Sequence, residues 1–198
     1  MSVRIERLTG SALAAAVPEL ARLRMMVFRD WPYLYDGTLD YEQEYLATFS
    51  SATGAVLVAA YDAGAMVGAA TAAPLLESAE EFAAPFRAHG DDPAQIFYFG
   101  ESVLLKAHRG KSLGHLFFDH REAHARSFGR FTLAAFCAVQ RPADHPLRPQ
   151  DYVPLDAFWR KRGFEKVDGL TTSFSWKDVD EPEETAKPMQ FWLKTLTP

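Results

Sequence analysis

The stretch that decides the fold is Ile96-Phe-Tyr-Phe-Gly-Glu-Ser-Val-Leu-Leu105, followed directly by Lys106-Ala-His-Arg-Gly-Lys-Ser-Leu-Gly114. The first segment is aromatic and apolar, as a buried strand is, and the second is a basic loop with two glycines that leads into a helix ending near Phe128. The first N–H groups of a helix have no intrahelical partner, and the helix dipole adds partial positive charge there. This order of strand, loop and helix predicts a phosphate-binding site, to which His108 can add a hydrogen bond or positive charge.

Two nucleotide-binding loops can be tested by their spacing. A Walker loop needs a glycine six positions before Lys111, where the chain has Leu105. A dinucleotide loop needs three glycines after the first strand, and this loop has two at another interval. An ordinary strand-to-helix turn with solvated basic side chains remains the alternative to a phosphate site.

Working outward from this stretch, apolar periodicity predicts a mixed α/β fold. Helices are expected at 11–31, 40–49, 78–89, from 114 to about 128, and at 155–162, and strands at 3–8, 55–61, 66–73, 96–105, 131–139, 171–176 and 189–196. The remaining segments include a Pro-rich link over 141–154 and an acidic loop over 178–188. The strand–helix–strand crossover requires a parallel pair. We therefore expect a mostly antiparallel seven-stranded sheet with a central parallel pair and helices on both faces.

Composition narrows the class of protein. The 198 residues are 48% apolar, which is enough for the core of one domain over residues 1–198. The net charge of −5 argues against binding to nucleic acid, and no apolar run is long enough for a membrane helix. A single cysteine, Cys137, and a charged N-terminus predict a cytoplasmic protein. Homodimerisation is left open.

Two motifs resemble one family. Arg109-Gly-Lys-Ser-Leu-Gly114 resembles the pyrophosphate loop of the GNAT superfamily of acyl-CoA-dependent N-acyltransferases, whose pattern is Q/R-x-x-G-x-G/A. Phe158-Trp-Arg-Lys-Arg-Gly-Phe164 resembles the end of the family's fourth helix, and the order of elements is similar over residues 3–196. The resemblance implies a GNAT-like fold and acetyl transfer from acetyl-CoA to the primary amine of a small molecule, by direct attack in a ternary complex and without a metal. The alternative is a catalytically weak CoA-binding regulatory or sensor domain of the same fold.

The resemblance also implies a set of CoA-binding residues. The loop would bind the pyrophosphate, a backbone N–H of the preceding strand would lie near the thioester carbonyl, and Trp159 would contact the cofactor; the residues concerned are Val103, Leu104, Leu105, Arg109, Gly110, Lys111, Ser112, Leu113 and Gly114. Two of these positions depart from the family pattern. Ser112 stands where the family prefers glycine, and Trp159 stands where many members have a tyrosine proposed to protonate the departing thiolate. Tyr152 and Cys137 are the candidate replacements for that acid, and the other interpretation of Cys137 is a small core hydrophobe.

Glu101 is the only carboxylate on its strand and is the candidate catalytic base. Burial among aromatic residues favours the neutral form of a carboxyl group, which suits a base that takes a proton through water. A charge that only binds substrate or faces the strand edge is the alternative.

The acceptor amine has two candidate groups of binding residues. Trp31, Tyr33 and Tyr35, beside Asp36 and Asp40, suit an amine with an apolar body, although these rings fit core packing equally well. In the Pro-rich link, Arg141, His145 and Arg148 could bind an acidic part of the acceptor, or the link could be a structural clasp.

The pair His120 and His124 has the i, i+4 spacing of metal ligands. The segment reads His-Arg-Glu-Ala-His rather than H-E-x-x-H and has no third ligand nearby. We therefore expect histidines that pack under the sheet and no metal site.

Overall fold

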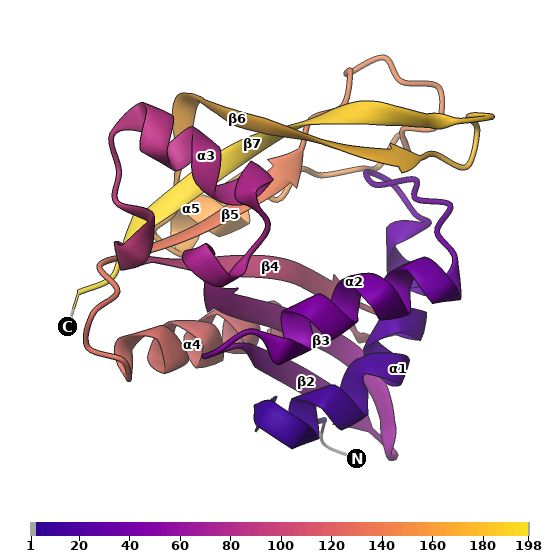
Figure 1. The fold of residues 1–198 in the computed structure, drawn as a ribbon. Coiled ribbons are helices and arrows are strands. Elements are labelled where there is room, and N and C mark those ends of the chain that lie inside the picture. The colour runs from indigo at the N-terminus through magenta and orange to yellow at the C-terminus, as the bar shows by residue number, and fades with distance from the viewer. Residues whose placement is uncertain (1–2, 198) are drawn as a thin grey trace.

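A computed structural model describes residues 3–197 and contains one seven-stranded sheet with the strand order β1-β2-β3-β4-β5-β7-β6 (Figure 1). The strands are β1 (Arg4–Leu8), β2 (Val56–Asp62), β3 (Ala65–Pro74), β4 (Ile96–Leu104), β5 (Leu133–Val139), β6 (Glu165–Lys177) and β7 (Glu184–Thr195). The α-helices are α1 (Gly10–Phe28), α2 (Leu39–Ser51), α3 (Glu80–His89), α4 (Leu113–Arg126) and α5 (Asp156–Lys161). Short 3-10 helices are η1 (Leu75–Glu77), η2 (Pro93–Gln95) and η3 (Lys106–His108). The fold class predicted from the sequence is confirmed.

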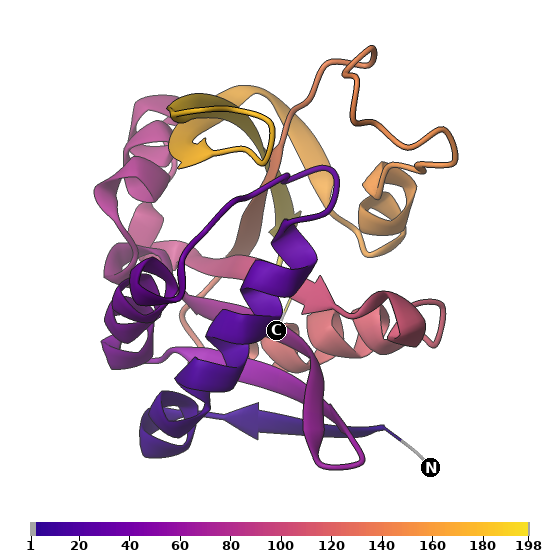
Figure 2. The same ribbon diagram turned by 90° about the vertical axis from the view of Figure 1, so that its right-hand side faces the viewer.

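The sheet is antiparallel except between β4 and β5. Only three residue pairs join these two strands, from Ile96–Leu133 to Tyr98–Ala135, and beyond Tyr98 the strands part. Figure 2 shows the end of β4, the start of α4 and helix α5 on the same side of the molecule. The parting of β4 from β5 therefore lies next to the basic loop.

Both faces of the sheet are covered by helices (Figure 1). Helices α1 and α2 pack on one face through apolar residues such as Leu20 and Leu46, and α3 covers the same face over β5–β7. Helix α4 packs on the other face through Phe117 and Phe118. No helix within residues 3–197 is both long and apolar enough to cross a membrane.

The last two strands are longer than the sequence predicts. Strand β6 begins at Glu165 rather than at Thr171, because a bulge between Lys166 and Thr171 carries the pairing past Gly169, whose φ is +81°. Strand β7 begins at Glu184, so the predicted loop over 178–188 shrinks to a turn. The charged residues of this hairpin pair with each other, as Lys187 does with Glu181 at 2.5 Å, and so remain compatible with a strand. Helix α1 also ends at Phe28, before Trp31.

Candidate acyl-transfer site

The loop before α4 leaves a group of backbone donors free. Gly110 and Ser112 have positive φ values of 75° and 62°, and this conformation turns the chain into the helix at Leu113. Within the part of the chain that the structure describes, the N–H groups of residues 110–114 form no hydrogen bond, whereas the next one, on His115, donates to the Ser112 carbonyl. This concentration of unpaired N–H groups at a helix N-terminus can bind an anion.

Ser112 and Gly114 show why this loop favours small residues. Ser112 lies in the left-handed region, where glycine is normally preferred, and its hydroxyl does not cap the helix. A Cβ atom built on Gly114 would lie 3.4 Å from the Phe158 ring of α5, in ordinary contact, so a larger side chain there would have to grow past this ring. Side chains longer than alanine at 114 would therefore meet α5.

The basic side chains near the loop have different partners. His108, which was predicted to add a hydrogen bond or positive charge to the phosphate site, binds Asp62 instead. Its Nε2 lies 2.9 Å from Oδ2 of Asp62 at the end of β2, and this hydrogen bond lowers the pKa of Asp62. Arg109 donates from Nε to the Leu104 carbonyl at 3.1 Å. Lys111 forms no ion pair or hydrogen bond within residues 3–197, so its ammonium is free to bind a ligand.

The three predicted backbone donors of β4 do not face the same way. Leu105 donates its N–H to Val67 of β3 at 2.9 Å. The N–H groups of successive residues in a strand point to opposite sides, so the N–H of Val103 also points toward β3. The N–H of Leu104 points to the opposite edge, where β4 has parted from β5. Of the three residues, Leu104 is therefore the one whose N–H can reach a ligand between the strands.

A bulge in β4 presents Glu101. Ala70 pairs with Ser102 and Ala72 with Phe99, so Gly100 and Glu101 together oppose the single residue Thr71. The Thr71 hydroxyl accepts a hydrogen bond from the Glu101 N–H at 3.2 Å. A Cβ atom on Gly100 would lie 2.5 Å from this hydroxyl oxygen, which explains why the bulge needs glycine.

The Glu101 carboxylate is buried and only half paired. One oxygen, Oε2, lies 2.8 Å from Arg24 Nη1 of α1, and Arg24 also binds the fully buried Glu42 of α2 through Nε at 2.5 Å. Burial alone would lower the pKa of Arg24, but the charges of Glu101 and Glu42 raise it above its ordinary value, so the guanidinium stays charged. Glu101 Oε1 is buried and has no hydrogen-bond partner within residues 3–197.

Arg121 of α4 supports the same bulge from the opposite face. Its Nη1 donates to the main-chain carbonyls of Thr71 at 3.3 Å and Glu101 at 3.5 Å, and its guanidinium lies 4.4 Å from the Phe99 ring centre. Burial lowers the pKa of Arg121 to about 9, against the opposing charges of Glu101 and Glu122. Arg121 therefore binds the backbone of the bulge and leaves the Glu101 carboxylate to Arg24.

The sequence did not predict the roles of Arg24, Glu42, Thr71 and Arg121. Arg24 offered a signal, because it continues the apolar stripe of α1, in which Leu13, Val17 and Leu20 are buried. A charged residue on such a stripe needs a buried partner, but the sequence does not tell which one.

Three predicted site residues meet between the Pro-rich link and the α1–α2 loop. Trp31 lies 5.1 Å from His145 and 5.8 Å from Tyr152, measured between ring centres. Burial and the charge of Asp156 raise the pKa of Tyr152, against a lowering by Arg148, so its phenol is a neutral donor at pH 7. Its hydroxyl forms no hydrogen bond to another described residue.

Arg141 is the clasp rather than an acceptor ligand. It binds Asp178 through two hydrogen bonds of 2.5 and 2.9 Å and donates to the carbonyls of Pro32 and Tyr33 at 2.8 and 2.6 Å. These donors face into the protein and tie the β6–β7 turn to the α1–α2 loop. The acceptor role predicted for Arg141 conflicts with this geometry, because the Nε, Nη1 and Nη2 atoms of its guanidinium already donate hydrogen bonds within the protein.

The other aromatic and acidic residues of this loop are also engaged. Tyr33 packs between Phe28 and Trp176, with ring centres at 4.5 and 5.9 Å. Burial raises the pKa of Tyr35. Asp36 pairs with Arg29 and Lys177, at 2.7 and 2.8 Å. Tyr33 and Asp36 therefore hold the loop against β6; the ring of Tyr33 packs as the core-packing alternative describes.

Cys137, the other candidate for the thiolate acid, is poorly suited to that role. The Cys137 thiol lies 3.1 Å from the Tyr98 hydroxyl, and burial raises the pKa of Cys137 to about 12, so it is a weak acid. Trp159 packs against Phe136 and Trp192 of the sheet, with ring centres at 5.0 and 5.1 Å, and it is Phe158 that contacts Gly114. Tyr152 is left as the candidate acid.

One member of the His120–His124 pair contacts the backbone. His124 Nε2 lies 3.0 Å from the Gly54 carbonyl, and burial lowers the pKa of His124. Over residues 3–197 no group of three His, Cys, Asp or Glu side chains is placed to hold a metal ion.

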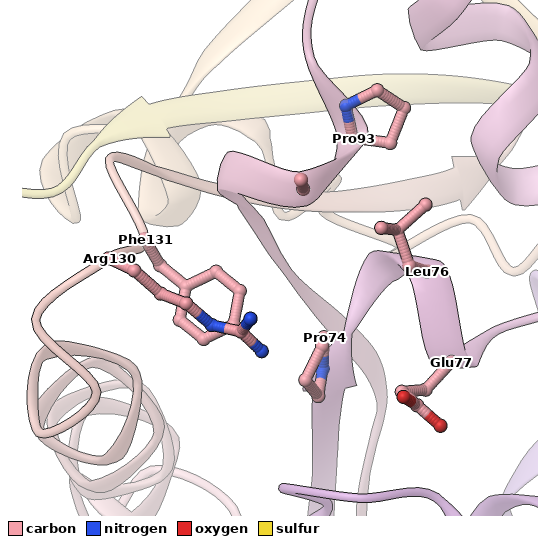
Figure 3. Close-up of a pocket in the computed structure, with 7 residues that line it drawn as sticks. Pro74, Leu76, Glu77, Pro93, Arg130 and Phe131 are labelled. Atoms are coloured by element: carbon pink, nitrogen blue, oxygen red, sulfur yellow. The ribbon is translucent and has the colours of Figure 1, made fainter.

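Two hollows on the described surface lie near β3 and β4. The larger, about 250 Å³, lies between α2 and α3 over β3 and β4, and Glu101 and Gly100 are in its wall. The smaller, about 100 Å³, lies at the other end of β4 from the basic loop, where Arg130 extends over Phe131 and faces Pro74 and Leu76 (Figure 3). Only the larger hollow reaches the β4 bulge.

Comparison with known proteins gives matches of structure only. No protein-family model matches the chain, and no curated protein matches it by sequence. The ribosomal-protein-alanine N-acetyltransferase from Brucella melitensis has a similar structure, with a TM-score of 0.62 and 16% identity over 98% of this chain and 99% of that chain. An aminoglycoside 6'-N-acetyltransferase complexed with coenzyme A gives 0.58 and 16% over 98% of both chains. An acetyltransferase of the GNAT family from Streptococcus pneumoniae gives 0.58 and 12% over 99% of this chain and 100% of that chain. The fold of this chain is therefore the fold of the GNAT acetyltransferases.

Proposed function

We propose that this protein is an N-acetyltransferase that transfers the acetyl group of acetyl-CoA to the primary amine of a small molecule, by direct attack in a ternary complex. The observation that carries the proposal is the set of unpaired N–H groups over residues 110–114, placed where β4 has parted from β5. An extended cosubstrate in which a flexible arm joins a pyrophosphate to a thioester matches this arrangement.

The residues of the chain supply binding and proton transfer. The free N–H groups and Lys111 would bind the pyrophosphate, and the Leu104 N–H would face the cosubstrate between the strands. The amine nitrogen attacks the thioester carbonyl carbon, and the C–S bond breaks. Glu101 would take the proton that the ammonium must lose before attack, either directly or through water.

Tyr152 is proposed to protonate the thiolate that leaves. Its phenol stays neutral at pH 7, lies in the link that follows β5 and has a hydroxyl free of hydrogen bonds to the described residues. The acylated nitrogen then loses its second proton, which replaces the one that Tyr152 gave to the thiolate, directly or through water. Glu101 releases the proton of the ammonium to water, so both groups are restored for the next turnover.

The CoA site is tested by adding charge at the helix N-terminus. Gly114→Glu places a carboxylate beside the unpaired N–H groups, and we expect it to abolish CoA binding in calorimetry, because the carboxylate competes with the pyrophosphate and repels it. Gly114→Gln adds nearly the same bulk without the charge and should keep more affinity than Gly114→Glu. Wild-type affinity in Gly114→Glu would overturn the loop assignment.

Catalysis is tested separately by release of free thiol from acetyl-CoA in the presence of a panel of primary amines. Release that depends on the amine is the expected result. Binding of CoA with no release for any amine would overturn the proposal and favour a CoA-binding domain without turnover.

A further inference from the structure

The hollow between α2 and α3 has a distinct chemistry. Its wall contains the rings of Tyr45, Phe49, Phe82 and Tyr98, and Phe82 lies 4.7 Å from Tyr98 between ring centres. The rest of the wall consists of alanines, small polar residues, Gly100 and two carboxylates, the exposed Glu77 and Glu101; the small residues are Ala52, Ala72, Ala73, Ala79, Thr48, Thr71 and Ser78. Aromatic walls with small side chains between them leave room for a flat apolar group.

The one buried charge in this wall is Glu101. Its side chain is 7% exposed, and one oxygen is bound to Arg24 while the other, Oε1, is buried without a partner among the described residues. An unpaired buried carboxylate oxygen is costly unless a donor reaches it. Arg24 forms ion pairs with both Glu42 and Glu101, so two carboxylates share one guanidinium where α1 and α2 pack on the bulge. A ligand ammonium would supply the missing donor and the missing positive charge.

The size of the hollow limits the ligand. Pockets for drug-sized molecules have volumes of roughly 300–1,000 Å³, and this one has about 250 Å³. A single or fused ring with a short aminoalkyl chain fits this volume. A sugar with several hydroxyl groups would find few polar partners in such a wall and would leave its own hydroxyls unpaired.

We propose that this hollow is the acceptor site and that the acceptor class is a small primary amine with an aromatic or similarly flat apolar body. The inference rests on the proposed function for the identity of the reaction, and on the hollow alone for the class of ligand. It moves the acceptor away from Trp31, Tyr33 and Tyr35, none of which is among the described residues that line the hollow.

Binding is measured first, by calorimetry without acetyl-CoA, so that it does not depend on turnover. The probes are 2-phenylethylamine, its neutral counterpart 2-phenylethanol, and glucosamine. We expect 2-phenylethylamine to bind most tightly. Glu101→Gln should weaken its binding roughly 10- to 100-fold, the effect of losing a charge-assisted hydrogen bond, and should change the binding of 2-phenylethanol less than about twofold.

Two further variants sharpen the test. Glu44→Gln removes an exposed carboxylate of α2 that is outside the hollow, and it should leave the binding of 2-phenylethylamine unchanged. Phe82→Ala should weaken both aromatic probes alike, because it removes a ring from the wall. Thermal unfolding of each variant checks that the fold is retained, and Glu101→Gln keeps the shape that Arg24 needs.

The outcomes separate this inference from the proposed function. Equal or tighter binding of glucosamine, or equal losses in Glu101→Gln and Glu44→Gln, would overturn the inference even if other amines are acetylated. Binding of 2-phenylethylamine that depends on Glu101, with no thiol release from acetyl-CoA, would support the acceptor class as a binding site and overturn the transferase activity.

Discussion

Ser112 occupies a backbone conformation that costs an L-residue roughly 1–2 kcal/mol, and its hydroxyl does not cap the helix that it begins. Ser112→Gly should therefore change CoA affinity less than about tenfold, or roughly 1.4 kcal/mol. Stability should change by less than about 1 kcal/mol, because relief of strain is offset by the greater freedom of glycine in the unfolded chain. Calorimetry and urea unfolding measure the two quantities. A large loss of affinity in both Ser112→Gly and the control Ser112→Ala would show that the hydroxyl is a phosphate ligand.

His124 links stability to pH. Burial lowers its pKa in the folded state, although the hydrogen bond to the Gly54 carbonyl partly opposes this. Below about pH 6.5, the ordinary histidine value, the unfolded chain binds a proton that the folded chain does not, so the free energy of unfolding falls as pH falls. We expect this fall between pH 7.5 and 5.5 to be smaller in His124→Gln than in the wild type. The exposed His89→Gln is the control, and identical slopes in His124→Gln and wild type would contradict the assignment.

Single residues also show which parts of the site the sequence could reveal. The loop from Arg109 to Gly114 is local, so its glycines and its place between strand and helix predicted the unpaired N–H groups. Glu101 was found because it is the one carboxylate on its strand. Its partner Arg24 is on helix α1, far away in the sequence, and the half-paired state of the carboxylate depends on how α1, α2 and the β4 bulge pack. Such tertiary contacts leave no trace in sequence spacing.

At the scale of elements, apolar periodicity predicted the helices and strands in their order along the chain, because most elements bury one face. It failed at strand ends that have no alternating apolar pattern and are held only by pairing with the neighbouring strand. The Glu165 end of β6 is separated from the rest of the strand by a bulge, and the Glu184 end of β7 is charged but paired across the hairpin. The clasp role of Arg141 needed the same kind of information, because Asp178 and the α1–α2 loop are far from it in sequence.

The clasp should contribute measurably to stability. Arg141→Met leaves Asp178, which is 1% exposed, without its bidentate partner, and breaking a buried ion pair typically costs about 3–5 kcal/mol. We expect the low end of this range, because Lys187 still lies 3.4 Å from the Asp178 carboxylate. Urea unfolding gives the value, and Arg148→Met, in the same link, should cost less than about 1 kcal/mol. Equal losses in the two variants would show that Arg141 acts only as a surface charge.

At the scale of the molecule, the parted strands should respond to CoA more than the rest of the sheet. A ligand at 100 times its Kd stabilises the folded state by about 2.7 kcal/mol. Local opening of the loop and of β4 after Tyr98 should be suppressed further, because these segments would contact the ligand. Hydrogen exchange with and without CoA is the measurement. Additional protection is expected over residues 99–114, beyond that of β1 and β2, and equal protection throughout the sheet would contradict this site.

The three-pair junction of β4 and β5 also has a mechanical consequence. Strand β1 lies at one edge of the sheet and β7 lies next to the other edge, so a pulling force applied to β1 and β7 must cross this junction. The β2–β3 and β5–β7 junctions share the load over seven pairs each. We therefore expect the sheet to separate first between β4 and β5, where the cosubstrate is proposed to lie. A bound cosubstrate would contact both strands and raise the force needed to separate them.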